Sequence, residues 1–141
     1  SVGSHYNATE GWGLAYDGEH LILSDGTATL QFMDPETFAP QRSVQVEYAG
    51  NAISQLNELE YINGEVWANV WQTDRIVAID PTTGLVVAVV DASGLVTDRS
   101  GFKKGDVLNG IAHDPDSGRF LLTGKRWPVL FEVVFEPAPT D

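Results

Sequence analysis

Apolar and polar residues alternate along most of this chain with the two-residue period of β-strands. Residues 56–75 show the pattern best, because Leu59 and Tyr61 alternate with polar neighbours ahead of the dipeptide Asn63-Gly64. Asn-Gly between two alternating runs is a strong signal for a tight hairpin turn. This stretch therefore predicts two antiparallel strands joined by a short turn.

Two more strands are expected directly after this hairpin. Residues 76–79 form an apolar run that is followed by Asp80-Pro81, and residues 85–90 form another. Four short antiparallel strands within about forty residues are the unit of a β-propeller blade. The density of β-branched and aromatic residues leaves little room for helix.

The same unit recurs along the chain. Gly18 and Gly64 lie 46 residues apart, and Asp34-Pro35 precedes Asp80-Pro81 by the same 46. We therefore expect an all-β chain of propeller blades, with repeats at about 11–46, 56–90 and 107–135, the last with three strands. A β-sandwich with evenly spaced hairpins is the alternative, but a sandwich does not need matched turns at a fixed period.

The remaining segments are expected to connect or to flank the repeats. Residues 47–55 are expected to be a loop that turns at Gly50-Asn51, and residues 91–106 a longer loop. Residues 1–9 could be a tag remnant, a linker or the strand of a preceding blade. The Pro-containing tail 136–141 is expected to leave the sheet and end disordered.

Composition narrows the possible functions. The 141 residues indicate one domain, and the absence of Cys excludes disulfides and thiolate metal sites. The net charge of −12 argues against nucleic acid and anionic membrane surfaces as partners, and it would mildly favour a substrate with a free amine. No apolar run reaches the roughly 18 residues of a membrane span. The chain starts at Ser1, so we expect a processed, trimmed or partial product.

The propeller expectation brings certain residues together, because the innermost strand of each blade lines the central channel. Aligning the first strands of the three repeats gives one ring position, occupied by Trp12, Asn57 and Asn109. Aligning the ends of the second strands gives a second ring position, occupied by Asp25, Trp71 and Lys125. The paired positions are 13, 14 and 16 residues apart, and a longer hairpin turn explains the last value.

These side chains suit an aromatic-walled pocket with a few directed polar groups. A Lys can stabilise an oxygen that gains negative charge, and an Asn can orient an amide through its donor and acceptor. The competing interpretation is that the Trp residues belong to the core between blades and that Lys125 is a surface charge. We apply it to Trp67 and Trp127, and we assign Trp12, Trp71 and Lys125 to the site.

Other kinds of site find little support in the sequence. His5, His20 and His113 share no spacing and no carboxylate cluster suited to zinc, so we expect no metal site. The run 114–118 resembles a calcium loop only faintly, because it lacks the length and the closing Glu. A hairpin turn explains it better.

Five runs of the sequence resemble motifs of the plant-type and bacterial glutaminyl cyclases. They are residues 10–14 (EGWGL), 24–30 (SDGTATL), 56–60 (LNELE), 67–74 (WANVWQTD) and 123–128 (TGKRWP). The resemblance covers residues 10–135 and implies a five-bladed propeller, of which this chain would hold about three blades. It also implies an enzyme unrelated to the zinc-dependent animal enzymes.

The resemblance implies a glutaminyl-peptide cyclotransferase, which converts the N-terminal Gln of peptides and proteins to pyroglutamate and releases ammonia without a cofactor. Asn57 and Lys125 match family residues that hold the amide and meet the oxyanion, and Trp12 and Trp71 match residues that wall the substrate. The ring alignment adds Asp25 and Asn109 as substrate-binding candidates.

One part of the family site is expected outside this sequence. The resemblance places the acid/base Glu and a further Trp in a blade upstream of Trp12. We therefore expect the chain to work with the missing N-terminal blades as a separate fragment, or to assemble with identical chains. The resemblance implies a secreted or periplasmic location. A fragment that binds peptide N-termini without turnover, and a purely architectural blade array, remain alternatives.

Overall fold

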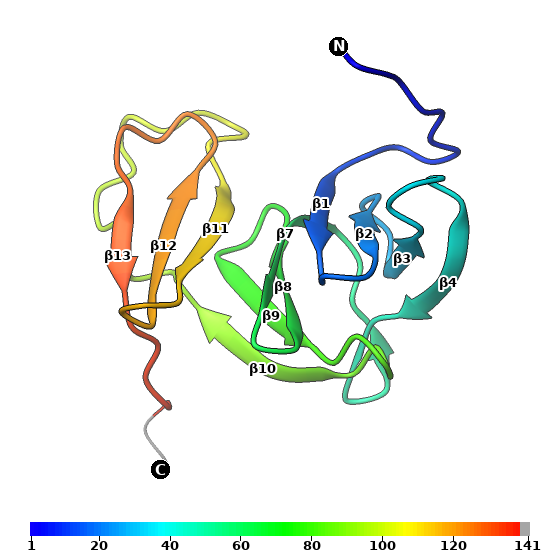
Figure 1. Cartoon of the computed structure of the whole chain (residues 1–141). Coiled ribbons are helices and arrows are strands. Elements are labelled where there is room, and N and C mark those ends of the chain that lie inside the picture. Colours follow the sequence, from blue (N-terminus) through cyan, green and yellow to red (C-terminus); the bar gives the residue numbers. More distant parts are fainter. Residues whose placement is uncertain (139–141) are drawn as a thin grey trace.

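The structure is a computed structural model that describes residues 1–138, so the expectation of disorder at 139–141 lies outside the described residues. It contains thirteen strands, and no helix occurs in residues 1–138. The strands form three large antiparallel sheets and one small ribbon (Figure 1). We call the large sheets blades 1, 2 and 3 in chain order.

Blade 2 contains the hairpin predicted at Asn63-Gly64. Both turn residues have positive φ, 52° and 92°, which is the requirement of the tight turn that matches strand twist. The four antiparallel strands of this blade follow one another in sequence order. They are β7 (Leu56–Ile62), β8 (Glu65–Val70), β9 (Arg75–Ile79) and β10 (Val86–Asp91).

Blades 1 and 3 have the same consecutive order, and blade 3 has one strand fewer. Blade 1 consists of β1 (Gly13–Tyr16), β2 (Leu21–Ser24), β3 (Thr29–Met33) and β4 (Pro40–Gln45). Blade 3 consists of β11 (Leu108–Asp114), β12 (Arg119–Gly124) and β13 (Phe131–Val133). The three sheets lie inside the expected repeats or end one residue beyond them.

The connection at 47–55, which the sequence analysis treats as a loop, contains a small ribbon. β5 (Glu47–Tyr48) pairs with β6 (Asn51–Ala52) around a turn in which Ala49 and Gly50 have positive φ. Only two residue pairs support the ribbon, which is too short for a hydrophobic alternation to show in the sequence.

The blades stand side by side, with the first strands β1, β7 and β11 nearest one another (Figure 1). One apolar core lies between blades 1 and 2 and contains Phe32, Leu59 and Val66. A second core lies between blades 2 and 3 and contains Ile76 and Ile111, among others. Consecutive four-stranded sheets stacked in this way are propeller blades, which confirms the predicted fold class and disfavours a sandwich.

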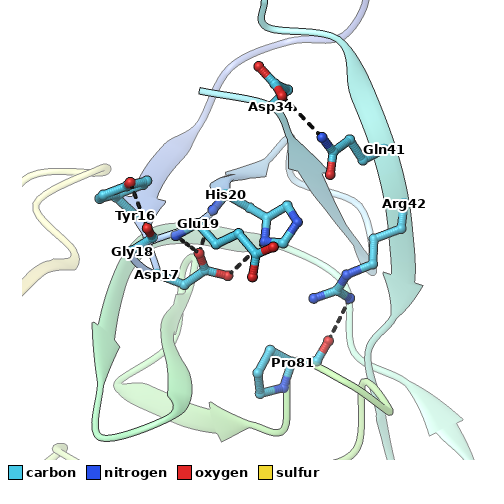
Figure 2. A network of polar contacts seen from close by, with 9 residues as sticks. All are labelled: Tyr16, Asp17, Gly18, Glu19, His20, Asp34, Gln41, Arg42 and Pro81. Atoms are coloured by element: carbon cyan, nitrogen blue, oxygen red, sulfur yellow. Dashed lines mark hydrogen bonds and ion pairs between the residues drawn. The ribbon is translucent and has the colours of Figure 1, made fainter. Parts of the chain in front are cut away.

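The outer side of blade 1 is held by turns and by one contact to blade 2 (Figure 2). The Asp17 carboxylate accepts hydrogen bonds from the amides of Glu19 and His20 and closes the turn between β1 and β2. Burial acts to raise the pKa of Asp17, but these hydrogen bonds outweigh it and the pKa is lowered. Arg42 of β4 donates to the carbonyl of Pro81 at 2.8 Å and so joins the two blades.

The two Asp-Pro turns identified by their spacing have the same construction. Asp34 accepts hydrogen bonds from the amides of Glu36 and Thr37 between β3 and β4. Asp80 accepts from the amides of the residues two and three positions later, between β9 and β10. The repeated dipeptide therefore marks a repeated side-chain-capped turn.

Blades 1 and 2 approach each other closely at Gly13. A Cβ atom on Gly13 would lie 2.0 Å from the backbone oxygen of Asn57, so no larger residue fits without movement of the two blades. The hydroxyl of Ser24, which pairs with Gly13 across the hairpin, donates to the same oxygen at 2.5 Å. This contact fixes the inner ends of the first two blades against each other.

We expect Gly13→Ala to lower the free energy of unfolding by roughly 1–3 kcal/mol, because the added methyl group overpacks the contact between the blades. Gly94→Ala is the matched control, since nothing lies within 4 Å of a Cβ at that position. Urea unfolding of both variants measures the difference. Equal midpoints for the two variants would contradict the close contact.

Candidate active site

Asn57 lies in an irregular part of the innermost strand of blade 2. β7 pairs with β8 at Leu56 and again at Leu59, and the two residues between them have no register partner. Such a bulge bends the strand and redirects its side chains. Asn57 is almost fully buried, and its carbonyl faces blade 1 through the contact with Ser24.

Asn109 lies in the equivalent bulge of blade 3. β11 pairs with β12 at Leu108 and again at Ile111, and Asn109-Gly110 is skipped between them. The matching irregularities place Asn57 and Asn109 at the same position of successive blades. The side-chain oxygen Oδ1 of Asn109 is buried and has no hydrogen-bond partner in residues 1–138.

Trp12 and Trp71 meet across the boundary between blades 1 and 2. Their ring centroids lie 5.2 Å apart and the rings are nearly perpendicular, at 80°. Edge-to-face aromatic pairs of this kind contribute about 0.5–1.5 kcal/mol beyond the burial of their surface. The amide of Trp12 donates to the carbonyl of Ser24 and that of Trp71 to the carbonyl of Gln55, which anchors both residues beside the inner strands.

The strand register differs from the ring alignment at the position assigned to Asp25, Trp71 and Lys125. Leu14, Leu59 and Ile111 of the inner strands pair with Leu23, Ala68 and Leu122 of the second strands. The third residue after each of those partners is Gly26, Trp71 and Lys125. The position of Trp71 and Lys125 therefore belongs to Gly26 in blade 1, and Asp25 is one residue out of register.

The environment of Asp25 agrees with this shift. Its carboxylate accepts hydrogen bonds from the amide and hydroxyl of Thr27, at 3.1 and 2.6 Å, and so caps its own turn. Gly26 in turn leaves room for an aromatic ring, because a Cβ there would lie 2.7 Å from Trp12. The alignment by spacing selected Asp25, whereas Gly26 is the residue at this position that leaves room for Trp12.

Lys125 occupies in blade 3 the place that Trp71 occupies in blade 2. Its amide donates to the carbonyl of Val107, as that of Trp71 does to Gln55, and the residues that follow, Arg126 and Gln72, both have positive φ. The side chain of Lys125 is exposed and makes no hydrogen bond or ion pair within residues 1–138. Its ammonium group is therefore available to a ligand.

Trp67 and Trp127, which the sequence analysis assigned to the core, pack against other apolar side chains. Trp67 contacts Phe120 and Phe135, with ring centroids at 5.0 and 5.5 Å. Trp127 is buried against Gly124 and donates from its indole nitrogen to the carbonyl of Asp106. Both lie in the core between blades 2 and 3.

Glu58 is a residue that the sequence analysis did not assign to the site. It lies beside Asn57 in the β7 bulge, and its carboxylate accepts a hydrogen bond from the amide of Ile111 in blade 3 at 2.9 Å. Burial raises the pKa of Glu58 to about 7, against the lowering effect of that hydrogen bond, and Glu60 raises it further. The signal in the sequence is the interrupted alternation, with two polar residues between Leu56 and Leu59.

No group of three or more metal-ligating side chains gathers anywhere in residues 1–138. The three His residues lie apart: His5 stacks on Phe38, His20 contacts Asp17, and His113 packs on Phe120. Within the described part of the chain, no helix has the length and apolar character needed to cross a membrane.

We expect Gly26→Ala to displace the Trp12 ring and break its contact with Trp71, because the new methyl group would overlap the indole. Gly50→Ala is the matched control, since φ is also positive at Gly50 but nothing lies within 4 Å of a Cβ there. Both substitutions strain the backbone, and only Gly26→Ala should change the near-UV circular dichroism of the Trp pair. An unchanged spectrum for Gly26→Ala would contradict this packing.

Comparison with known proteins agrees with this geometry. Residues 2–135 match the family model of glutamine cyclotransferases. The chain is 47% identical over 135 residues to a glutaminyl-peptide cyclotransferase of Arabidopsis thaliana, and the match covers 94% of this chain and 42% of that protein. The chain thus spans less than half of this curated relative.

Solved structures show the same relationship. The crystal structure of glutaminyl cyclase from Myxococcus xanthus matches with a TM-score of 0.85 and 46% identity, over 89% of this chain and 55% of that one. Hydrazine synthase of Kuenenia stuttgartiensis matches with a TM-score of 0.60 at 15% identity, over 94% of this chain and 35% of that one, and shares the fold alone. On the evidence of the family model, the strand pattern and the inner-strand motifs, this chain belongs to the glutamine cyclotransferase family.

Proposed function

We propose that the chain forms part of a glutaminyl-peptide cyclotransferase, which converts the N-terminal Gln of peptides or proteins to pyroglutamate and releases ammonia. The observation that carries the proposal is the Trp12–Trp71 pair beside the Asn57 bulge, in a chain of this family. The pair supplies an apolar wall, and the bulge supplies amide groups next to it.

The proposed reaction is an intramolecular acyl transfer. The α-amine of the substrate attacks its own side-chain amide carbon, a C–N bond forms, and the carbonyl oxygen becomes negatively charged. The amine then loses a proton, the amide nitrogen gains one, and ammonia leaves as the original C–N bond breaks. The nucleophile and the electrophile belong to one residue, so the enzyme mainly orients them and stabilises charge.

We assign the roles as follows. Asn57 orients the substrate amide, and the ammonium group of Lys125 meets the oxyanion. Trp12 and Trp71 enclose the side chain of the substrate, and Asn109 contributes an amide from blade 3. Asp25 would contribute its negative charge near the substrate amine rather than a direct hydrogen bond, because its carboxylate caps its own turn.

The proposal invokes no metal and no cofactor, because it assigns proton transfer to a Glu and stabilisation of the oxyanion to Lys125. The acid/base group is the Glu that the family resemblance places in a blade before Trp12. The same resemblance supports a secreted or periplasmic location, which fractionation of expressing cells would test. Recovery of the protein only in the cytosolic fraction would contradict that location.

A surface of blade 1 supports the presence of a further blade. Leu14 is 58% exposed, whereas Leu59 and Ile111, at the same position of blades 2 and 3, are 2% and 5% exposed because the preceding blade covers them. Tyr16 is likewise exposed, and Tyr61, its equivalent, packs against the core between blades 1 and 2. We propose that a preceding blade with the acid/base Glu covers Leu14 and Tyr16.

The test of the activity is ammonia release from a peptide that begins with Gln, in a preparation in which this chain is assembled with the blades that precede it. The same peptide with an acetylated N-terminus is the control, because it has no free amine. Binding of the free peptide without ammonia release would favour the alternative of a binding module.

In that preparation, we expect Lys125→Ala to lower kcat by roughly 10²–10³-fold, because an oxyanion donor acts mainly in the transition state. Trp71→Ala should mainly raise KM, since it removes a wall that contacts substrate in the ground state. Lys104→Ala, an exposed Lys in the loop before β11, is the control. Equal rates for Lys125→Ala and Lys104→Ala would show that Lys125 is only a surface charge.

We expect this chain by itself to associate through blade 1, because an exposed apolar blade face promotes association. Leu14→Asp should lower the average mass measured by sedimentation at the concentration where the unmodified chain associates. Leu85→Asp is the control, since Leu85 is 53% exposed but lies elsewhere on the surface. A stable monomer of the unmodified chain would contradict both the preceding-blade proposal and self-assembly of identical chains.

A further inference from the structure

The bulge of β11 is held by the neighbouring blade. The residues Asn109-Gly110 are skipped in the pairing with β12, so their own sheet offers them no register partner. Buried backbone donors in such a bulge must find other acceptors. Two consecutive amides at this point, those of Gly110 and Ile111, find them in blade 2.

The two acceptors come from adjacent strands of that blade. Asn69 of β8 accepts from the amide of Gly110 through Oδ1 at 2.9 Å, and Glu58 of β7 accepts from the amide of Ile111 through Oε2, also at 2.9 Å. Asn69 is fully buried. Both hydrogen bonds cross the boundary between blades 2 and 3. Together they fix the position and orientation of the β11 bulge relative to blade 2.

Blade 3 itself restricts the bulge from the other side. Gly110 has a φ of 151°, and a Cβ there would lie 2.8 Å from the methyl group of Thr123. A side chain therefore does not fit at this position without movement of Thr123. Asn109 precedes Gly110, and its buried Oδ1 has no partner within residues 1–138.

The boundary between blades 1 and 2 has a related arrangement. On the first strand, Gly13 of blade 1 corresponds to Glu58 of blade 2. On the second strand, Ser24 of blade 1 corresponds to Asn69 of blade 2. Ser24 donates to the carbonyl of Asn57, and Gly13 leaves room for that carbonyl. In both cases these two positions hold the bulge that carries the Asn of the next blade.

We propose that Glu58 and Asn69 are positioning residues, which fix the β11 bulge across the blade boundary and thereby direct the amide of Asn109 toward the candidate site. The proposal rests on the proposed function for the role of Asn109. The fixation of the bulge itself is independent of any activity and can be measured separately.

The charge of Glu58 gives a direct readout of this contact. Burial raises the pKa of Glu58 to about 7, so the carboxylate gains its charge near neutral pH. A hydrogen bond to a charged acceptor is stronger than one to a neutral acceptor. The amide of Ile111 should therefore report the ionisation of Glu58, through a proton resonance that moves downfield as the pH rises through about 7.

The effects of other titratable groups on the Ile111 amide must be distinguished from that of Glu58. The elements packed against Glu58 carry Tyr16 on β1, Glu60 and Tyr61 on β7, Glu65 on β8, and His113 and Asp114 on β11. Burial also raises the pKa of Glu60, and His113 lowers it. Glu60→Gln is therefore the matched control, because it removes a carboxylate of the same strand that accepts no hydrogen bond from Ile111.

The test is an NMR pH titration of the ¹⁵N-labelled full chain. In the unmodified chain, we expect the Ile111 amide to titrate near pH 7. In Glu60→Gln the titration should remain but move to lower pH, because Glu60 no longer raises the pKa of Glu58. In Glu58→Gln the titration should disappear, while the amide stays protected from exchange because the Gln carbonyl still accepts the bond. In Glu58→Ala, exchange at Ile111 should be roughly tenfold faster or more.

The same logic applies to Asn69. We expect Asn69→Ala to speed exchange at Gly110 and to leave the titration of Ile111 in place. An Ile111 amide that does not titrate, or one that titrates unchanged in Glu58→Gln, would overturn the proposal. If Glu58→Ala or Asn69→Ala does not fold, Glu58→Gln against Glu60→Gln still decides it.

Measurement of kcat provides a second, separate test of the proposal. In the preparation that releases ammonia, Glu58→Ala should lower kcat, and Glu58→Gln should restore most of it at every pH. Loss of the Ile111 titration without any effect on kcat would show that the bulge is held but that Asn109 does not serve the reaction. Absence of ammonia release from the unmodified preparation would count against the proposed function and leave the NMR result standing.

Discussion

Each blade of this protein must cover the apolar face of its neighbour. A four-stranded sheet with alternating side chains has two faces, and here both are apolar: Leu59 and Val66 of blade 2 point to blade 1, while Ile76 points to blade 3. No single sheet buries both faces by itself, so the sheets stack in sequence. The close approach at Gly13, where the backbone of Asn57 replaces a side chain, follows from this stacking.

The stacking also explains why the polar candidates lie where they do. The inner strands of blades 2 and 3 carry bulges at equivalent positions. A bulge turns polar side chains out of the alternation and leaves backbone groups to be satisfied by the adjacent blade. Ser24, Glu58 and Asn69 satisfy them, and Asn57 and Asn109 are presented at the inner ends of the blades.

The candidate site is thus a product of several blades. Trp12 comes from blade 1, Trp71 and Asn57 from blade 2, and Lys125 and Asn109 from blade 3. Such a site depends on the relative placement of the sheets, which the apolar cores maintain. A change at a blade boundary can therefore alter the site even where no residue of the site is replaced.

The strands, the turns and the repeat can be predicted from the amino-acid sequence, because these depend on alternation and on local turn chemistry. The hairpin at Asn63-Gly64, the paired turns at Asp34 and Asp80, and the packing of Trp67 and Trp127 follow from the residues alone. The motifs of the inner strands also carry the resemblance to the glutaminyl cyclase family.

Register and burial at the inner ends of the strands depend on how the strands and blades pack against one another. Spacing along the sequence aligned Asp25 with Trp71 and Lys125. The strand pairing instead aligns Gly26 with these two residues. A register shift of one residue becomes visible only when the paired strands are known. The sequence analysis also did not identify Glu58, since its burial and its hydrogen bond to Ile111 of blade 3 exist only in the folded chain. The contacts that fix the bulges join residues 33, 41 and 53 positions apart, and no local pattern in a sequence encodes contacts at that distance.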